Sequence, residues 1–507
     1  MEKVRPAIDR WALCIALFVA IMMCTGGISS VEPPMIYVHL VLALALIAAA
    51  LVRLFQQGFS NRLAQAASWI AVAIYLLVLL QLVPLPPSLW THLPGRELVL
   101  RNLGLLDEKA PWMPLTLSPE ATRQCALALM PPIAVFFATL TLSARNCMPI
   151  VIAILLCTLP SVSLALLQHL RGADGSYYIY ESSYGIGTGV FNNRNFFAAQ
   201  IYTALPFLGF ALATMTRRFH LPLLLVGFLG LTFLIFLLSG LAVSESRTGI
   251  ALSMLALGFA AIVARGGFVA SRSGLWMLGA SAMIVGLMIV AQASMMGIMR
   301  FAEPELAMDI RSEIWSTSIA LLKEHFMLGS GLGSFPSLYQ MVESPAVLQD
   351  TYVNHVHNDW FELAIETGAP GIVLELAFLA WYATSFWRIW RFGSSGGAAN
   401  IQRTASLVLP LLMLHSLDDF AMRTPALITL LGLCCGLMCL SPVARSIADQ
   451  QTTKPKGPKH ATTPTKPFLR PERGFRPQSA QNLQLVGGLD KIASQLQNYL
   501  IFGRETV

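Results

Sequence analysis

Long runs of apolar residues, separated by short polar stretches, follow one another along most of the chain. A membrane-spanning α-helix needs about 20 apolar residues, and runs of about this length predict roughly twelve spans. The runs lie near residues 11–29, 36–52, 67–84, 121–142, 147–168, 195–215, 221–243, 249–264, 275–293, 361–387, 404–417 and 425–441. The pattern therefore predicts an all-α integral membrane protein.

Composition supports this prediction. Of 507 residues, 55% are hydrophobic and only 12% are charged, and the mean hydropathy is +0.63. A water-soluble fold of this composition would have too little polar surface. The formal net charge of +7 lies mainly in loops and in the C-terminal tail. It therefore indicates membrane topology and does not indicate a nucleic-acid partner.

The distribution of basic residues predicts which loops face the cytoplasm, since cytoplasmic loops are enriched in Lys and Arg. With twelve spans, both termini lie inside, and the inward loops are basic. They contain Lys3, Arg5, Arg10, Arg53, Arg62, Arg145, Arg217, Arg218, Arg265, Arg272, Arg388, Arg391 and Arg403. The opposite side receives loops at about 85–120, 169–194 and 294–360.

Two parts of different composition follow from this topology. Residues 1–440 form a polytopic membrane domain. Residues 441–507 form a basic, Pro-rich cytoplasmic tail, whose composition cannot bury a core and predicts disorder. Within the tail, the sequence GLDKIASQLQNYLIF (488–502) has apolar residues at helical spacing and predicts a short amphipathic helix.

Four arginines lie on the outer side, where the topology rule does not predict them. They are Arg194, Arg247, Arg311 and Arg423, each near the outer end of a predicted helix. A single boundary arginine is equally well explained as a membrane anchor. Four of them on one side, each in a polar cluster, favour a phosphate or diphosphate ligand, because the guanidinium offers paired donors and stays charged.

One polar stretch, YVNHVHNDWFELAIETG (352–368), precedes an apolar run. Asn358 or Asp359 can cap the following helix, and Glu362 has the spacing of a capping-box partner. Gly368 and Pro370 predict a kink. Most of the charge in the stretch is therefore explained by the start of a helix.

The two histidines of this stretch need another explanation. His355 and His357 alternate, so on an extended segment they point to one side, and one of them can accept a proton from a hydroxyl group. A metal site would need a third ligand, which the sequence does not supply nearby. The glycine-rich GSGLGS (329–334) lacks the lysine of a nucleotide-binding loop and predicts a turn.

The chain resembles the O-antigen ligase and O-antigen polymerase superfamily of bacterial inner-membrane glycosyltransferases. The resemblance rests on TGVFNNRNFFAAQ, SESRTG, RSEIWSTSIALLKEHFMLGSGLGSF, HNDWFELAIETGAPG and HSLDDFAMRTPA, which occur in this order within about 188–426. It implies a GT-C-like helical bundle with about twelve spans and a large periplasmic loop at about 294–360. It also implies transfer of a glycan from undecaprenyl diphosphate to an acceptor, with no metal and no nucleotide cofactor.

The resemblance also implies roles for particular residues. Arg247 and Arg311 would hold the lipid diphosphate and stabilise it as the leaving group, and His357 would orient or deprotonate the attacking sugar hydroxyl, with inversion at the anomeric carbon. Further candidates for substrate contact are Arg194, Arg423, Asn358 and Asp359, and Asp359 is also expected to position His357.

The acceptor stays open at this point. A ligase joins the glycan to lipid A core, a polymerase joins repeat units to one another, and a protein O-oligosaccharyltransferase modifies a protein. Another class is a polysaccharide-lipid flippase or transporter. Transporters more often place charges near mid-membrane, whereas the charges here gather at one face.

Overall fold

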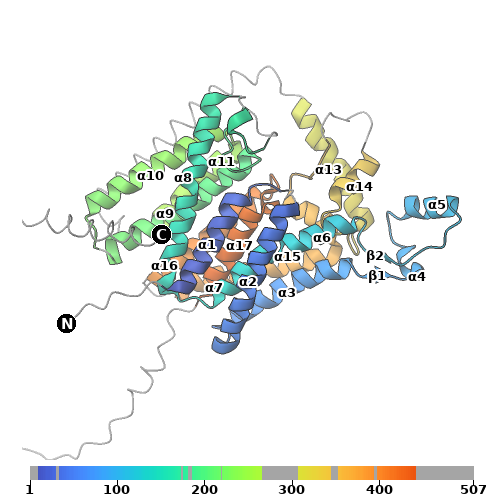
Figure 1. Ribbon diagram of the computed structural model, residues 1–507, viewed down its shortest axis with the longest axis horizontal. Helices are drawn as coiled ribbons and strands as arrows, with labels where there is room; N and C mark the ends of the chain where they lie inside the picture. The colour runs from blue at the N-terminus through green and yellow to red at the C-terminus, as the bar shows by residue number, and fades with distance from the viewer. Residues whose placement is uncertain are drawn as a thin grey trace, which may run out of the picture. The chain divides into compact units, whose positions relative to one another are not determined.

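The structure is a computed structural model, and it describes residues 9–29, 33–172, 175–180, 185–218, 220–264, 306–343, 352–392 and 397–440. Most of these residues are helical (Figure 1). The α-helices are α1 (Arg10–Thr25), α2 (Pro33–Gln57), α3 (Arg62–Gln81), α4 (Pro87–Trp90), α5 (Glu97–Leu105), α6 (Pro119–Ala128), α7 (Met130–Leu140), α8 (Met148–Arg171), α9 (Arg194–Arg218), α10 (Leu223–Ser244), α11 (Arg247–Ala264), α13 (Leu306–His325), α14 (Phe335–Val342), α15 (Asp359–Phe392), α16 (Gly397–His415) and α17 (Pro425–Met438). Short 3₁₀ helices are η1 (Ala144–Asn146), η2 (Gly175–Tyr177) and η5 (Ala421–Arg423).

The predicted spans can be compared with these helices. In the described part of the chain, eight helices are long and apolar enough to cross a membrane, and α1 and α17 are shorter apolar helices. The predicted run at 121–142 is divided into α6 and α7, and the run at 404–417 falls in α16. The expectation of a multi-pass, all-α membrane protein is confirmed. The total of twelve stays a prediction, because the run at 275–293 lies outside the described residues, as does the tail at 441–507.

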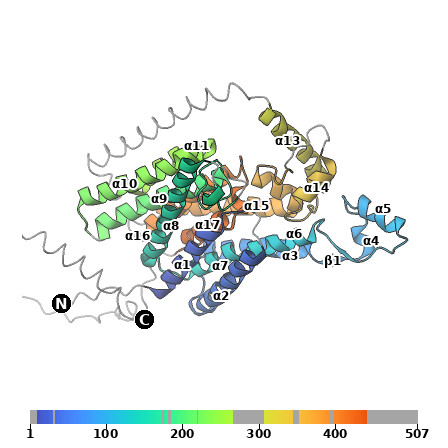
Figure 2. The same ribbon diagram turned by 45° about the horizontal axis from the view of Figure 1, so that its top comes forward.

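Helix α9 is the most enclosed of these spans. In its most apolar stretch 94% of the residues are buried, and Phe196, Phe197 and Tyr202 are fully buried. It packs against α8, α10, α11 and α16, while α17 packs against α1, α7 and α16 (Figure 2). A helix that is apolar on all sides belongs in the interior of a bundle. Helix α9 is therefore an interior helix of the bundle, and its first residue, Arg194, lies at one end of it.

Helix α15 contains the predicted kink. Gly368 has φ of +61° and ψ of −157°, which is not a helical conformation. Pro370 has no N–H, so it cannot donate to the carbonyl of Glu366 as a helical residue would. Ala369 donates its N–H to the carbonyl of Phe326 at 2.7 Å instead of continuing the helix. The carbonyls at the end of the first part of α15 are thus left without helical donors.

The glycine loop, residues 329–334, supplies the missing donors. The N–H of Ser330 donates to the carbonyl of Ile365 at 3.1 Å, and the N–H of Gly331 donates to the carbonyl of Glu366 at 2.9 Å. The loop is therefore a structural partner of the break in α15, in agreement with the prediction of a turn.

Gln81, the last residue of α3, hydrogen-bonds to both the glycine loop and the first part of α15. Its amide nitrogen donates to the carbonyl of Glu366 at 2.9 Å, and its amide oxygen accepts from the N–H of Leu332 at 2.9 Å. The side chain of Gln81 is buried, so both of its polar ends need partners. The break in α15 is thus stabilised by hydrogen bonds from the glycine loop and from α3.

The region expected as an outer loop at 85–120 has structure of its own. Strands β1 (Pro84–Leu85) and β2 (Met113–Pro114) pair antiparallel, with Pro84 opposite Pro114. The buried Arg96 donates from Nη2 to the carbonyl of Pro114 at 2.7 Å, and the buried Trp90 donates from Nε1 to the carbonyl of Pro111 at 2.7 Å. These contacts close the segment that contains α4 and α5.

Replacing Gly368 by alanine tests the break in α15. A Cβ at this position would lie 2.5 Å from the backbone nitrogen of Gly329, and φ of +61° is unfavourable for a residue with a side chain. We expect Gly368→Ala to lower the free energy of unfolding by about 1–3 kcal/mol, measured by thermal unfolding in detergent. Gly258→Ala is the matched control, because a Cβ there meets no atom within 4 Å. Equal melting temperatures for the two variants would contradict the role assigned to the break.

Candidate functional site

Residues 352–358 precede α15 and carry both candidate histidines. We call them the histidine segment. His357 has a φ of +59°, in the left-handed region, which histidine enters more readily than most residues. The extended alternation expected for the two histidines is therefore wrong at His357. Both rings nevertheless contact Phe420, with ring-centroid distances of 4.1 Å for His355 and 5.2 Å for His357. The two imidazoles are thus brought together on one side chain.

His357 forms a pair with a buried carboxylate. Its Nδ1 lies 3.2 Å from Oδ1 of Asp419, which is almost fully buried. Asp419 also accepts from Nδ2 of Asn195 at 2.6 Å and from the N–H of Phe420 at 2.9 Å. Oδ1 of Asn195 accepts in turn from the hydroxyl of Ser246 at 2.7 Å. The start of α9, the connection between α10 and α11, and the loop after α16 therefore meet at His357.

Asp359 does not have the position expected from the sequence. We expected it to position His357, but Asp419 makes that contact. Oδ2 of Asp359 accepts from the hydroxyl of Ser416 at 2.9 Å and from the N–H of Met422 at 3.1 Å. The carboxylate therefore ties α15 to the loop after α16.

Asn358 is the cap of α15, as one of the two alternatives predicted. Its Oδ1 accepts from the N–H of Phe361 at 3.0 Å, and its Nδ2 donates to the carbonyl of Leu417 at 3.1 Å. Both ends of the amide thus have protein partners. The sequence expectation that Asn358 and Asp359 contact substrate stays a prediction.

Arg423 lies among three carboxylates of α15. Its Nε lies 3.4 Å from Oδ1 of Asp359, its Nη2 lies 3.1 Å from Oε1 of Glu362, and its Nη1 lies 3.0 Å from Oε2 of Glu366. The carboxylate side chains are at most 4% exposed, and that of Arg423 is 13% exposed. We call these four residues the ion cluster. The three acids share one face of the first two turns of α15, as their spacing allows.

The contacts of Glu362 show that the prediction of a capping-box role for this residue is wrong. Its Oε1 is shared between Arg423 and Nδ1 of His355, which lies 2.8 Å away, and its Oε2 accepts from the N–H of Val356 at 2.8 Å. The acids of this stretch therefore serve mainly to bind Arg423 and the histidine segment. In the described residues, no group of three or more His, Cys, Asp or Glu side chains is arranged to bind a metal ion.

Neighbouring charges shift the pKa values of Arg423 and Asp419, which lie in the loop after α16. Burial acts to lower the pKa of Arg423, but Glu362, Glu366 and Asp359 outweigh it and hold that pKa well above its usual value. Burial acts to raise the pKa of Asp419, but hydrogen bonding and charge interaction with His357 outweigh it, and the pKa is lowered. A carboxyl with a lowered pKa favours the folded state at neutral pH, and this contribution is lost as the pH falls through the folded-state pKa.

Two of the predicted arginines lie beside the His357 pair. Arg194 is the first residue of α9 and Arg247 the first of α11, and their neighbours Asn195 and Ser246 are hydrogen-bonded to each other. Nη1 of Arg194 lies 3.9 Å from Oε2 of Glu245, and both side chains are more than a third exposed. Arg247 is exposed, and no described residue forms an ion pair with it. The structure thus brings Arg194 and Arg247 to the same end of the bundle as His357.

For Arg311, the structure describes only the position of the backbone. It lies in α13, which packs against α14 and α15. Its side chain lies outside the part of the chain that the structure describes.

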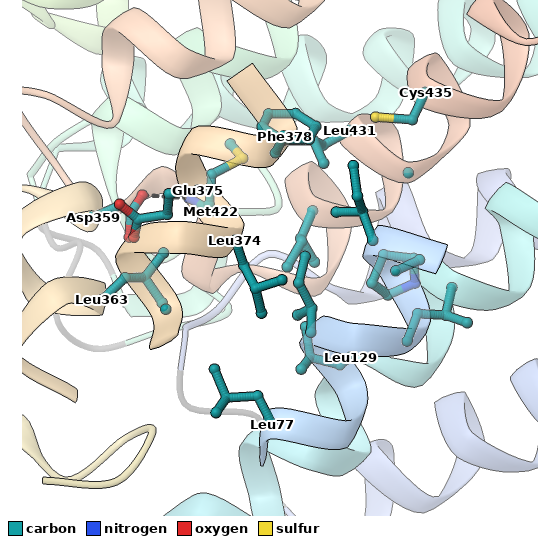
Figure 3. Close-up of a pocket in the computed structure, with 18 of the residues that line it drawn as sticks. Leu77, Leu129, Asp359, Leu363, Leu374, Glu375, Phe378, Met422, Leu431 and Cys435 are labelled. Carbon is teal, nitrogen blue, oxygen red and sulfur yellow. Dashed lines mark hydrogen bonds between the residues drawn. The ribbon is translucent and has the colours of Figure 1, made fainter. Parts of the chain in front are cut away.

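An apolar cavity of about 300 Å³ adjoins the ion cluster (Figure 3). It lies between α3, α7, α15 and α17, and Leu77, Leu363, Leu374 and other apolar side chains line most of it. Asp359 lines it from the ion cluster, and Glu375 is a second carboxyl in its wall. The cavity therefore joins a charged region to the apolar interior of the bundle.

Some residues of the site were not found from the sequence. Asp419 and Asn195 were not singled out, although both lie within quoted motifs, HSLDDFAMRTPA and TGVFNNRNFFAAQ. The available signal was a pair of acids, Asp418 and Asp419, a few residues before an arginine in an otherwise apolar region. The partners lie more than 60 residues apart in sequence, so spacing alone could not pair them.

Residues 231–376 of the chain match the O-antigen ligase family. This segment belongs to the O-antigen ligase and polymerase superfamily. The resemblance noted in the sequence is thereby confirmed for a segment that contains Arg247, Arg311 and His357, while Asp419 and Arg423 lie beyond it. No curated protein matches the chain.

Replacing Arg423 by alanine tests the ion cluster of this O-antigen ligase-like protein. Removal of the guanidinium leaves three carboxylates in a buried site, so we expect Arg423→Ala to lower the free energy of unfolding by about 3–5 kcal/mol. Arg194→Ala is the control, because its ion pair is exposed and such pairs contribute about 0–1 kcal/mol. Thermal unfolding in detergent measures both. A melting temperature of Arg423→Ala equal to that of the control would contradict a stabilising role for the cluster.

Proposed function

We propose that this protein transfers a glycan from undecaprenyl diphosphate to an acceptor sugar hydroxyl on the periplasmic side of the bacterial inner membrane, without a metal ion. The reaction serves O-antigen or exopolysaccharide assembly, as a ligase or a polymerase. The acceptor is then lipid A core or a second glycan. In this proposal both termini lie in the cytoplasm and the loop at about 294–360 lies in the periplasm.

The observation that carries the proposal is the contact between His357 and Asp419. A carboxylate can only accept a hydrogen bond, so Nδ1 of His357 carries the hydrogen and Nε2 is left to accept a proton. A base held in this way can take the proton of a hydroxyl group as the hydroxyl oxygen attacks. Glycosyl transfer to a sugar hydroxyl needs such a group.

The arginines support a diphosphate leaving group. The bond between the anomeric carbon and the diphosphate oxygen breaks with its electron pair on oxygen, and guanidinium groups stabilise that charge. Arg247 is exposed beside the His357 pair, and Arg311 lies in the same family segment. Arg194 is a further candidate for contact with the donor.

The apolar cavity supports a donor with a lipid chain. Its wall is made mainly of apolar side chains, most of them from α3, α7, α15 and α17. Such a wall offers van der Waals contacts to a polyprenyl chain and has few polar groups that the chain would leave unpaired. An amphiphilic donor can thus place its chain among the helices and its diphosphate at their ends.

Loss of activity in two arginine variants tests the diphosphate assignment. With purified protein, undecaprenyl-diphosphate glycan and acceptor, we expect Arg247→Ala and Arg311→Ala each to lower the transfer rate by about 100- to 1,000-fold. Arg101→Ala, in the exposed helix α5, is the control and keeps the wild-type rate. Activity of the wild type in EDTA is expected to stay unchanged. Full activity of both variants would refute the diphosphate assignment, and loss of activity in EDTA would refute metal independence.

Substitution of the histidine pair tests the assignment of the base. His357→Asn preserves the left-handed backbone, which asparagine also tolerates, but removes the proton acceptor, so we expect a loss of about 100- to 10,000-fold in kcat. Asp419→Asn is expected to lower kcat less, because the imidazole remains but its tautomer is no longer fixed. The measurement is kcat at saturating donor, with melting temperatures checked in parallel. An unchanged kcat in His357→Asn would exclude His357 as the base.

A further inference from the structure

A second histidine–carboxylate pair lies at the site, and the proposed reaction uses only the first. Nδ1 of His355 lies 2.8 Å from Oε1 of Glu362, just as Nδ1 of His357 lies 3.2 Å from Oδ1 of Asp419. In both pairs the acid is buried, so the carboxylate holds the ring and fixes the hydrogen on Nδ1. No described residue hydrogen-bonds to either Nε2. His355 therefore has the same arrangement as His357, with Nδ1 bonded to a buried carboxylate and Nε2 left without a described partner.

The two imidazoles lie in one place and both remain accessible. Their side chains are 15% exposed for His355 and 32% exposed for His357. Both rings contact Phe420. Both imidazoles therefore lie next to one aromatic side chain, and neither is fully buried.

The surroundings of the two pairs differ in charge. Asp419 is satisfied by uncharged donors, the Asn195 amide and the Phe420 N–H, in addition to His357. Glu362 instead belongs to the ion cluster, in which three carboxylates face a single guanidinium. His355 therefore lies beside a cluster of three acids and one guanidinium, whereas the acid beside His357 has only uncharged further partners. This difference in surroundings distinguishes the two imidazoles, and the proposed reaction already uses His357 as the base.

We infer that His355 is a second catalytic residue, which donates its Nε2 proton to the departing diphosphate. This inference rests on the function proposed above. The acceptor oxygen forms a bond to the anomeric carbon, and its proton passes to Nε2 of His357. The bond from that carbon to the diphosphate oxygen breaks, the electron pair stays on the oxygen, and the oxygen takes the proton of His355.

Inversion at the anomeric carbon explains why the acid and the base must be two separate groups. In an inverting displacement the nucleophile and the leaving group occupy opposite faces of the sugar. Inverting glycosidases place their acid and base about 6.5–9.5 Å apart for this reason. His355 and His357 both contact Phe420, and the inference assigns one imidazole to each face of the sugar.

The pH dependence of kcat tests this inference in the full-length protein. The ionisable groups around the two imidazoles in the described residues are Glu362, Asp359, Glu366, Arg423 and Asp419. We expect the wild-type profile to be bell-shaped, since the base must be neutral and the acid must be protonated. His355→Gln is expected to lose the fall of kcat at high pH and to lower kcat at neutral pH by about 100-fold, with little change in KM. His92→Gln, at an exposed histidine outside the site, is the control and keeps both limbs.

The possible outcomes separate this inference from the proposed function. If the wild type transfers no glycan, the proposed function itself fails. If the wild type is active and His355→Gln keeps both limbs, His355 only supports Glu362 and the inference is overturned, while the proposed function stands. If His355→Gln does not fold, the wild-type profile decides, because a single limb overturns the inference and two limbs support it.

Discussion

The guanidinium of Arg423 faces three buried carboxylates of one helix, and the geometry of the site depends on this contact. Each buried charge costs several kcal/mol to remove from water, and only a close, multiply bonded arrangement offsets that cost. In the planar fork of arginine, Nη2 contacts both Glu362 and Glu366, Nη1 contacts Glu366, and Nε contacts Asp359. The loop that carries Arg423 is therefore fixed to α15. Asp419 lies in this loop, so the same contact holds it beside His357.

The break in α15 completes this arrangement at the other end of the acidic turns. Because Gly368 leaves the helical conformation, the first part of α15 is a separate short helix that ends at the glycine loop. Asn358 caps its start, and Ser330 and Gly331 donate to its last carbonyls. A helix this short is marginal by itself. Its stability comes from the cap, the glycine loop and Arg423, which also position the histidine segment before it.

Several of these features could be predicted from the sequence because their signals are local. Apolar runs give the spans, Gly368 with Pro370 gives the kink, and Asn358 gives the cap. The position of Arg194 and Arg247 near His357 followed from topology, since all three were assigned to the same side. The pairing of Arg423 with α15 and of His357 with Asp419 was not predicted. Each pairing joins segments about 60 residues apart, and no periodicity or spacing encodes such a contact.

The same limit explains why the outer arginines could not be told apart in the sequence. Arg423 and Arg247 both lie at helix ends in polar clusters, yet the first is surrounded by carboxylates and the second is exposed. A diphosphate that bound Arg423 would have to displace Glu362 and Glu366 and leave their charges buried, which costs several kcal/mol. Arg247 is exposed, and among the described residues no buried carboxylate is paired with it. In the proposed reaction, the ion cluster would therefore act on the donor mainly through His355, which shares Oε1 of Glu362 with Arg423, and Arg247 is the arginine proposed to contact the donor directly.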